Sequence, residues 1–272
     1  MTTLITVLVV LVFAVLLYVF YRMQKRHAKF STRVYTALAI GIVFGGLLQL
    51  IFGVDNQVIS QSMEWINIVG EGYVGFLQML IMPLVFVSIV GAFTKMKVSE
   101  KLGKISATVL TSLLATTAIA ALIGIGTTIL FGLQGAKFTE GAAETARISE
   151  LATRQESIQG LTIPQQILSF IPKNVFADLA GTRATSTIGV VIFAAFVGIA
   201  YLGVKRKAPK EAEFFANLID SLYKIVMRIV TLVLRLTPYG VFALMTNVMA
   251  TSDFVAIINL GKFVLASYVA LL

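Results

Sequence analysis

The sequence contains no cysteine and a single histidine, and only 13% of its 272 residues are charged. The lack of cysteine excludes disulfides, thiolate nucleophiles and cysteine-ligated metal sites. His27 lies among cations in the segment RMQKRHAKF, which favours a solvated side chain over a metal ligand. No His or Cys is therefore present to activate a nucleophile within an apolar segment. The sequence predicts no enzyme, no resident cofactor and no metal centre.

Apolar residues make up 58% of the chain, and the mean hydropathy is +0.91. Soluble domains carry about 25% charged residues, so this composition indicates an all-α polytopic membrane protein. The net charge of +9 does not indicate nucleic acid, because membrane proteins gather Lys and Arg on cytoplasmic loops. Membrane lipid is therefore an expected partner, and nucleic acid is not.

The apolar run Gly72 to Phe93 is long enough to cross a bilayer, whose hydrocarbon layer of about 30 Å requires about 20 helical residues. Pro83 lies near its middle and has no N–H to donate to the preceding turn. Neighbouring groups can satisfy the freed carbonyl, so we expect a kinked span. Six further spans are expected, at residues 4–21, 35–52, 105–133, 188–204, 211–236 and from 255 to the last residue.

Three basic clusters set the expected orientation. They lie at residues 22–33, 95–104 and 205–210, and they alternate with segments poor in Lys and Arg. The positive-inside rule places such clusters in the cytoplasm and the N-terminus outside. A short loop with Asp55, Glu64 and Trp65 is then expected on the outer side. The sequence thus predicts a multi-pass protein of the plasma membrane.

Small residues mark two of the expected spans. Gly41, Gly45 and Gly46 form a small-xxx-small face suited to close helix contact. The span at 105–133 is rich in Thr, Ala and Gly, a composition typical of a helix packed against protein more than against lipid. We therefore expect close packing at both spans.

The segment at 211–236 carries Asp220, Lys224 and Arg228 at a spacing of four residues, on one helical face. Two interpretations stay open. A tilted helix can extend its cations to headgroups, or the ionisable residues can serve a function at membrane depth. Pro238 and Gly240 are expected to break this helix before its outer end.

Three segments resemble the dicarboxylate/amino acid:cation symporters, the family that includes the glutamate transporters. FLQMLIMPLVFVSIVGAF (76–93), VVIFAAFVGIA (190–200) and LTPYGVFALMTNVMA (236–250) are similar to the second-, fourth- and fifth-helix signatures of that family. GAAETAR (141–147), LSFIPKNVFADLAG (168–181) and the additional first span resemble the bacterial L-cystine uptake transporters most. The resemblance covers nearly the whole chain.

The resemblance implies a glutamate-transporter-like elevator fold, in which a homotrimer of scaffolds in the bacterial cell membrane supports moving transport domains. The family's substrate-binding hairpins have no match here, so we expect an N-terminal portion, truncated before the re-entrant hairpins, with substrate contacts after Leu272. The implied division is an anchor and basic loop at 1–30, scaffold helices at 31–104, a transport-domain helix at 105–133, an extracytoplasmic loop with short helices at 134–187, scaffold helices at 188–254 and the incomplete start of a transport-domain helix at 255–272.

Thr116 and Thr117 align with a Thr-Ser pair that helps bind sodium in the family, so the resemblance implies that they bind the coupling cation. Judged by residue type alone, they are helix-packing hydroxyls. Leu113 replaces a tyrosine found in archaeal relatives, which leaves sodium and protons open. The implied function is cation-coupled import of L-cystine. The alternatives are a dicarboxylate or glutamate symporter and a truncated, non-transporting membrane scaffold.

Overall fold

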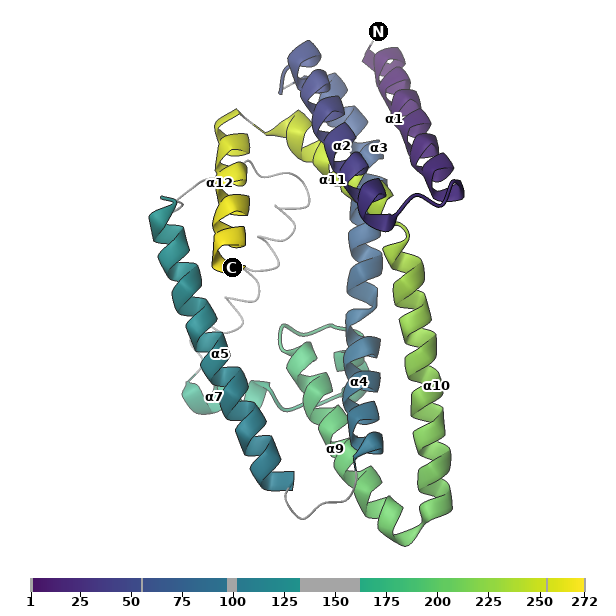
Figure 1. Cartoon of the computed structure of the whole chain (residues 1–272), viewed down its shortest axis with the longest axis vertical. Helices are drawn as coiled ribbons and strands as arrows, with labels where there is room; N and C mark the ends of the chain where they lie inside the picture. The colour runs from purple at the N-terminus through teal and green to yellow at the C-terminus, as the bar shows by residue number, and fades with distance from the viewer. Residues whose placement is uncertain (1, 55, 97–101, 133–161, 253, 272) are drawn as a thin grey trace.

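The computed structural model describes residues 2–54, 56–96, 102–132, 162–252 and 254–271, which form helices, turns and short connections without a strand (Figure 1). This agrees with the predicted all-α class. The helices are α1 (Thr2–Lys25), α2 (Phe30–Phe52), α3 (Gln57–Met79), α4 (Ile81–Lys95), α5 (Leu102–Leu130), α7 (Ile163–Ser169), α8 (Val175–Leu179), α9 (Ser186–Lys207), α10 (Pro209–Leu234), α11 (Thr237–Thr251) and α12 (Phe254–Leu271).

Within the described residues, four helical segments are long and apolar enough to cross a membrane: α1, α2, α9 and α3 together with α4. The helices α10 and α11 are together long and apolar enough to cross a membrane, as one span bent by 46°. Two predicted spans contain shorter apolar helical stretches, at Ala115–Leu130 of α5 and Gly261–Leu271 of α12. Five of the seven predicted spans thus have full-length counterparts.

The third span differs from the prediction, because its helix begins at Gln57. Glu64 and Trp65 therefore lie inside α3 and not in a loop. The Asn56 side chain caps the helix by accepting from the N–H of Val58 at 2.9 Å. Hydropathy alone missed this start, because the first half of α3 is amphipathic and buries only one face, against α1 and α11.

Two of the long spans, α3–α4 and α10–α11, are interrupted a few residues before a proline. Pro83 cannot donate to the Met79 carbonyl four residues earlier, and α3 ends at Met79. Pro238 leaves the Leu234 carbonyl free in the same way, and the Thr237 hydroxyl donates to that carbonyl at 2.7 Å. The predicted break before the end of the 211–236 helix is confirmed.

The most extensive helix contact joins α2 and α11. A Cβ atom on Gly41 would lie 2.9 Å from Met245 Cβ, and one on Gly45 would lie 2.5 Å from the Thr246 carbonyl oxygen. Real Cβ atoms do not approach other atoms this closely, so both positions require glycine. A Cβ atom on Gly46 would meet no atom of the described residues within 4 Å. The predicted contact face is therefore formed by Gly41 and Gly45 alone.

Helix α1 packs on this bundle through aromatic side chains. Phe13 stacks on Phe242 with ring centroids 4.9 Å apart, and Phe20 meets the same ring edge-on at 5.2 Å. All three rings are buried. Gln24 Oε1, near the end of α1, accepts from the Tyr239 hydroxyl at 3.3 Å and from Arg33 at 3.1 Å. Helix α1 is therefore part of the hydrophobic core.

The remaining helices form two further groups. Helices α4, α9 and α10 bury Val90, Ala194 and Ile219 between them, and α8 packs on α9. Helices α5 and α12 lie against each other and make no other extensive contact with the helices that the structure describes (Figure 1). We call α1–α4 and α8–α11 the packed part, and α5 with α12 the paired helices.

Two long rods run through the packed part: α3–α4, and α10–α11, which is bent by 46° where its two helices meet. The first covers 39 residues, or about 58 Å at about 1.5 Å per residue, whereas a bilayer measures about 40–45 Å between its headgroup surfaces. A tilt of about 40° from the membrane normal fits this rod into the bilayer. Gln24, near the end of α1, contacts Tyr239, and α4 ends at Lys95. The turn after α1 and the end of α4 lie at different levels of the molecule (Figure 1).

Candidate functional site

Thr116 and Thr117 lie in the middle of α5, and the side chains of both are exposed. The Thr116 hydroxyl donates to the Ser112 carbonyl one turn earlier, at 2.9 Å. Neighbouring residues of a helix point about 100° apart, so a regular helix does not direct both hydroxyls at one ion. The third residue of this prediction, Leu113, has a side chain outside the described part. A cation held here would require further oxygen ligands.

The charged side chains of the described residues form no evident metal site. No group of three or more His, Asp or Glu residues that could hold an ion occurs in the part of the chain that the structure describes. The described carboxylates that form ion pairs, Asp178 and Asp220, have Lys or Arg partners. These two ion-pair groups differ strongly in burial, and we describe them in turn.

Asp178 on α8 is completely buried, with 0% of its surface exposed. Arg183 holds both carboxylate oxygens, since its Nε donates to Oδ1 at 2.8 Å and its Nη2 to Oδ2 at 2.7 Å. The turn that permits this contact ends α8 at Gly181, whose φ of +73° is readily adopted by glycine. A buried charge is tolerated when it is paired and hydrogen-bonded in this way.

The pair also joins α7 to α9. The Ser169 carbonyl at the end of α7 accepts from the Thr185 hydroxyl at 2.9 Å and from Arg183 Nη1 at 3.3 Å. A Cβ atom on Gly189 of α9 would lie 2.8 Å from Asp178 Oδ2, so the carboxylate rests on the helix backbone. The hydrogen bond to Asp178 raises the pKa of the Arg183 guanidinium, although its burial acts in the opposite direction.

Sequence reasoning missed the Asp178–Arg183 pair. Residues 134–187 were predicted to form an outer loop with short helical pieces, and the described portion does contain the short helices α7 and α8. The second of these, α8, packs on α9. The available signal was an acid and a base five residues apart, separated by a glycine, in a half-apolar segment.

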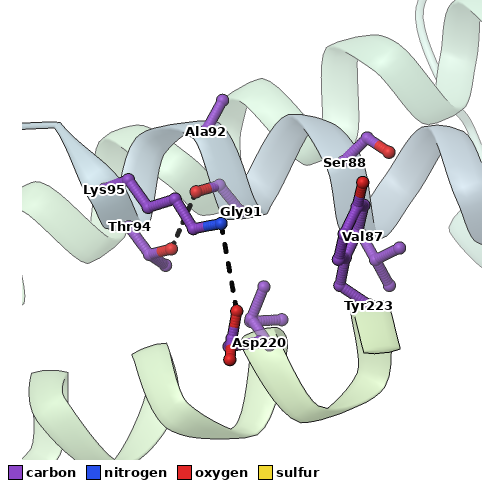
Figure 2. Close-up of a pocket in the computed structure, with 9 residues that line it drawn as sticks. Val87, Ser88, Gly91, Ala92, Thr94, Lys95, Asp220 and Tyr223 are labelled. Carbon is purple, nitrogen blue, oxygen red and sulfur yellow. Dashed lines mark hydrogen bonds and ion pairs between the residues drawn. The ribbon is translucent and has the colours of Figure 1, made fainter. Parts of the chain in front are cut away.

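Asp220 on α10 belongs to a more open group. Lys224, one turn later, places Nζ 2.7 Å from Oδ2. Lys95 of α4 places Nζ 3.9 Å from Oδ1, and Figure 2 shows this pair. The two lysine side chains are 75% and 69% exposed. Exposed pairs of this kind contribute about 0–1 kcal/mol each. Arg228 is exposed and forms no ion pair with the described residues, which favours the interpretation of cations extending to headgroups.

Long interrupted helices, an all-α core and apolar outer faces define a multi-pass membrane protein, and sequence comparison assigns its family. Residues 30–272 match the sodium:dicarboxylate symporter family. The chain belongs to this family. The match begins after α1, at the first residue of α2.

Among similar proteins are three named L-cystine uptake protein TcyP. That of Bacillus licheniformis is 53% identical over 99% of this chain and 59% of its own length. That of Bacillus subtilis strain 168 is 53% identical over 100% of this chain and 59% of its own length. That of Shouchella clausii is 54% identical over 99% of this chain and 57% of its own length. The chain thus spans 57–59% of the length of these relatives. Both the predicted family and the predicted likeness to bacterial L-cystine uptake transporters are confirmed.

Proposed function

We propose that this protein takes part in the cation-coupled import of L-cystine across the bacterial cell membrane. The observation that carries the proposal is the identity of 53–54%, spread over 99–100% of the chain, to proteins named for L-cystine uptake. Membership of a symporter family supports coupling to a cation, either sodium or protons. The substrate, the coupling ion and the assembly below are all parts of this proposal.

Uptake of labelled L-cystine tests the substrate. The gene in its natural form is expressed in bacteria that lack their own cystine importers, and the empty vector serves as the control. We expect uptake that unlabelled cystine suppresses and that excess glutamate or aspartate leaves unchanged. Suppression by glutamate or aspartate would instead support the dicarboxylate alternative, and uptake no greater than the vector's would refute import.

The coupling ion is tested on α5. Replacing Thr116 or Thr117 by valine keeps the side-chain shape and removes a hydroxyl oxygen, the type of ligand that a hard cation prefers. Thr128→Val is a matched control, because its exposed hydroxyl donates to the Gly124 carbonyl at 2.8 Å as Thr116 does to Ser112.

If sodium binds at the threonine pair, the sodium concentration for half-maximal uptake rises several-fold in T116V or T117V and stays unchanged in T128V. Replacement of sodium by choline should then abolish uptake. Uptake that survives in choline and stops with a proton uncoupler would assign the coupling to protons.

The division into scaffold and moving part extends the proposal. Helices α5 and α12 pack on each other while the packed part forms its own cores, which supports placing the paired helices in the transport domain. We expect the protein to assemble as a homotrimer through the packed part. Crosslinking in lipid and native mass measurement check the assembly, and a strict monomer in lipid would contradict it.

The N-terminus is proposed to lie outside. This orientation places the α1–α2 turn and the α9–α10 turn on one side, although the two turns lie at different levels of the rods (Figure 1). The absence of native cysteine allows a direct test with His27→Cys, Ala208→Cys and Gln57→Cys. An impermeant thiol reagent added to intact cells should label only the third. Labelling of only one of positions 27 and 208 would place them on opposite sides of the membrane, and it would refute the tilt of about 40° from the membrane normal.

A further inference from the structure

A cavity of ≈ 220 Å³ lies between α4 and α10, near the end of α4 (Figure 2). Four of its α4 residues lie on one helical face, because Gly91, Ala92 and Lys95 follow Ser88 by three, four and seven positions. The residues that matter below are Ser88, Gly91, Ala92 and Lys95 from α4 and Asp220 and Tyr223 from α10. The small residues Gly91 and Ala92 make room for the cavity. A Cβ atom added to Gly91 would meet, among the described residues, only Ile219, at 3.7 Å.

Three hydrogen-bond donors border this cavity. Tyr223 reaches from α10 to α4, and its hydroxyl lies toward Ser88 in Figure 2. Neither of these hydroxyls forms a hydrogen bond with the described residues, whereas the nearby Thr94 hydroxyl donates to the Gly91 carbonyl at 2.9 Å. The third donor is the Lys95 ammonium, which lies 5.7 Å from the centroid of the Tyr223 ring.

The charges sum to a net positive site once Lys224, which pairs with Asp220 beside the cavity, is counted with Lys95 and Asp220. Asp220 is held closely by Lys224 at 2.7 Å and only loosely by Lys95 at 3.9 Å. One lysine therefore neutralises the carboxylate, and Lys95 retains both its charge and free donor capacity. A ligand that suits this arrangement carries one negative charge, accepts hydrogen bonds from three donors and offers a hydroxyl to Asp220.

We propose that this cavity binds the headgroup of an anionic phospholipid, with phosphatidylglycerol as the fitting class. Its phosphate accepts from Lys95, Ser88 and Tyr223, and a glycerol hydroxyl donates to Asp220. Val87 and Ile219 supply an apolar border for the acyl chains. Basic pockets between helices at the cytoplasmic surface are typical sites for anionic headgroups. The assignment of this site to the inner leaflet rests on the orientation proposed above.

Lipid retention in native mass spectrometry tests the proposal without any measurement of transport. The protein, expressed from its natural gene, is offered equal amounts of phosphatidylglycerol and phosphatidylethanolamine in detergent. We expect preferential retention of phosphatidylglycerol, and we expect Lys95→Gln to reduce that preference about tenfold through the loss of a charged hydrogen-bond donor. Ala92→Leu should reduce it as well, because the larger side chain fills the cavity and leaves every charge in place.

Lys25→Gln is the matched control. Lys25 also ends a helix, and its ammonium lies 5.1 Å from the centroid of the Tyr21 ring, but it borders no part of this cavity. We expect this variant to keep the full preference. An equal loss in Lys25→Gln and Lys95→Gln, or equal retention of the two lipids by the unaltered protein, would overturn the site. Displacement of the lipid by inorganic phosphate at a similar concentration would overturn the lipid as the source of the phosphate.

Discussion

The packed part and the paired helices contain similar small residues in very different surroundings. Gly41 and Gly45 of α2 press against α11, whereas a Cβ atom added to Gly124 or Gly126 of α5 would meet no atom of the described residues within 4 Å. The composition of α5 predicted contact with protein but not with which helix, and among the described helices the contact is with α12. Composition therefore reports that a helix can be approached closely, and it does not identify the partner.

The largest expected effect concerns the buried ion pair of the packed part. Arg183→Gln leaves the Asp178 carboxylate buried without its partner, which costs about 3–5 kcal/mol of unfolding free energy. The pKa of Arg183 is raised above its ordinary value, so the stabilisation is fully present below that value and is lost only as the pH rises beyond it. Unfolding in mild detergent measures the loss. Lys224→Gln, at an exposed pair, is the control and should cost less than about 1 kcal/mol.

The aromatic core gives the next effect. Phe242→Ala removes a ring that contacts Phe13, Phe20 and Phe44. Lipid is as apolar as this core, so the cost is mainly the cavity, about 2–3 kcal/mol against about 3–5 in soluble cores. Phe263→Ala on α12, where the ring is 52% exposed, should cost less than about 1 kcal/mol. Equal costs would show that the two regions do not differ in packing.

An added methyl group should have opposite effects on stability at two adjacent glycines of α2. Gly45→Ala forces a Cβ against the Thr246 carbonyl and should destabilise by about 1–3 kcal/mol. Gly46→Ala adds a methyl group that meets none of the described residues, and it should stabilise the helix by about 0.5–1 kcal/mol. Thermal unfolding of both variants checks the difference. A neutral Gly45→Ala would mean that α2 and α11 are separated more widely than the structure shows.

The smallest effect is expected on α5. Gly124→Ala adds a methyl group where no atom of the described residues lies nearby, so the gain in helix propensity should stabilise by about 0.5–1 kcal/mol. The same unfolding measurement applies. Destabilisation would reveal a close partner of α5 outside the described residues, and it would weaken the contrast with the packed part.

Hydropathy and proline positions predicted much of this fold. The spans followed from apolar length, and Pro238 located the break between α10 and α11. The extent of α3 was not predictable in this way, because its first half buries one face and leaves Glu64 and Trp65 exposed on another. Sequence spacing indicates neither the capping by Asn56 nor the contacts with α11 that extend the helix.

The candidate sites were predictable to a smaller degree. Thr116 and Thr117 came from family resemblance, since their residue types alone indicate helix packing. The Asp178–Arg183 pair depends on the turn at Gly181, and the lipid cavity depends on the register of α4 against α10. Both arise from contacts whose geometry becomes visible only once the helices are placed, so composition and periodicity could not supply them.

The oblique rods also bear on the thickness of the surrounding bilayer. A rod of about 58 Å tilted by about 40° changes its inclination by about 1.5° for each ångström of thickness. Longer acyl chains would raise both rods toward the membrane normal, and shorter chains would lower them, with no helical hydrogen bond broken. Since α1, α2 and α11 pack around α3 at one end of the α3–α4 rod, the chain length of the lipids would set the angle at which that whole bundle stands in the membrane.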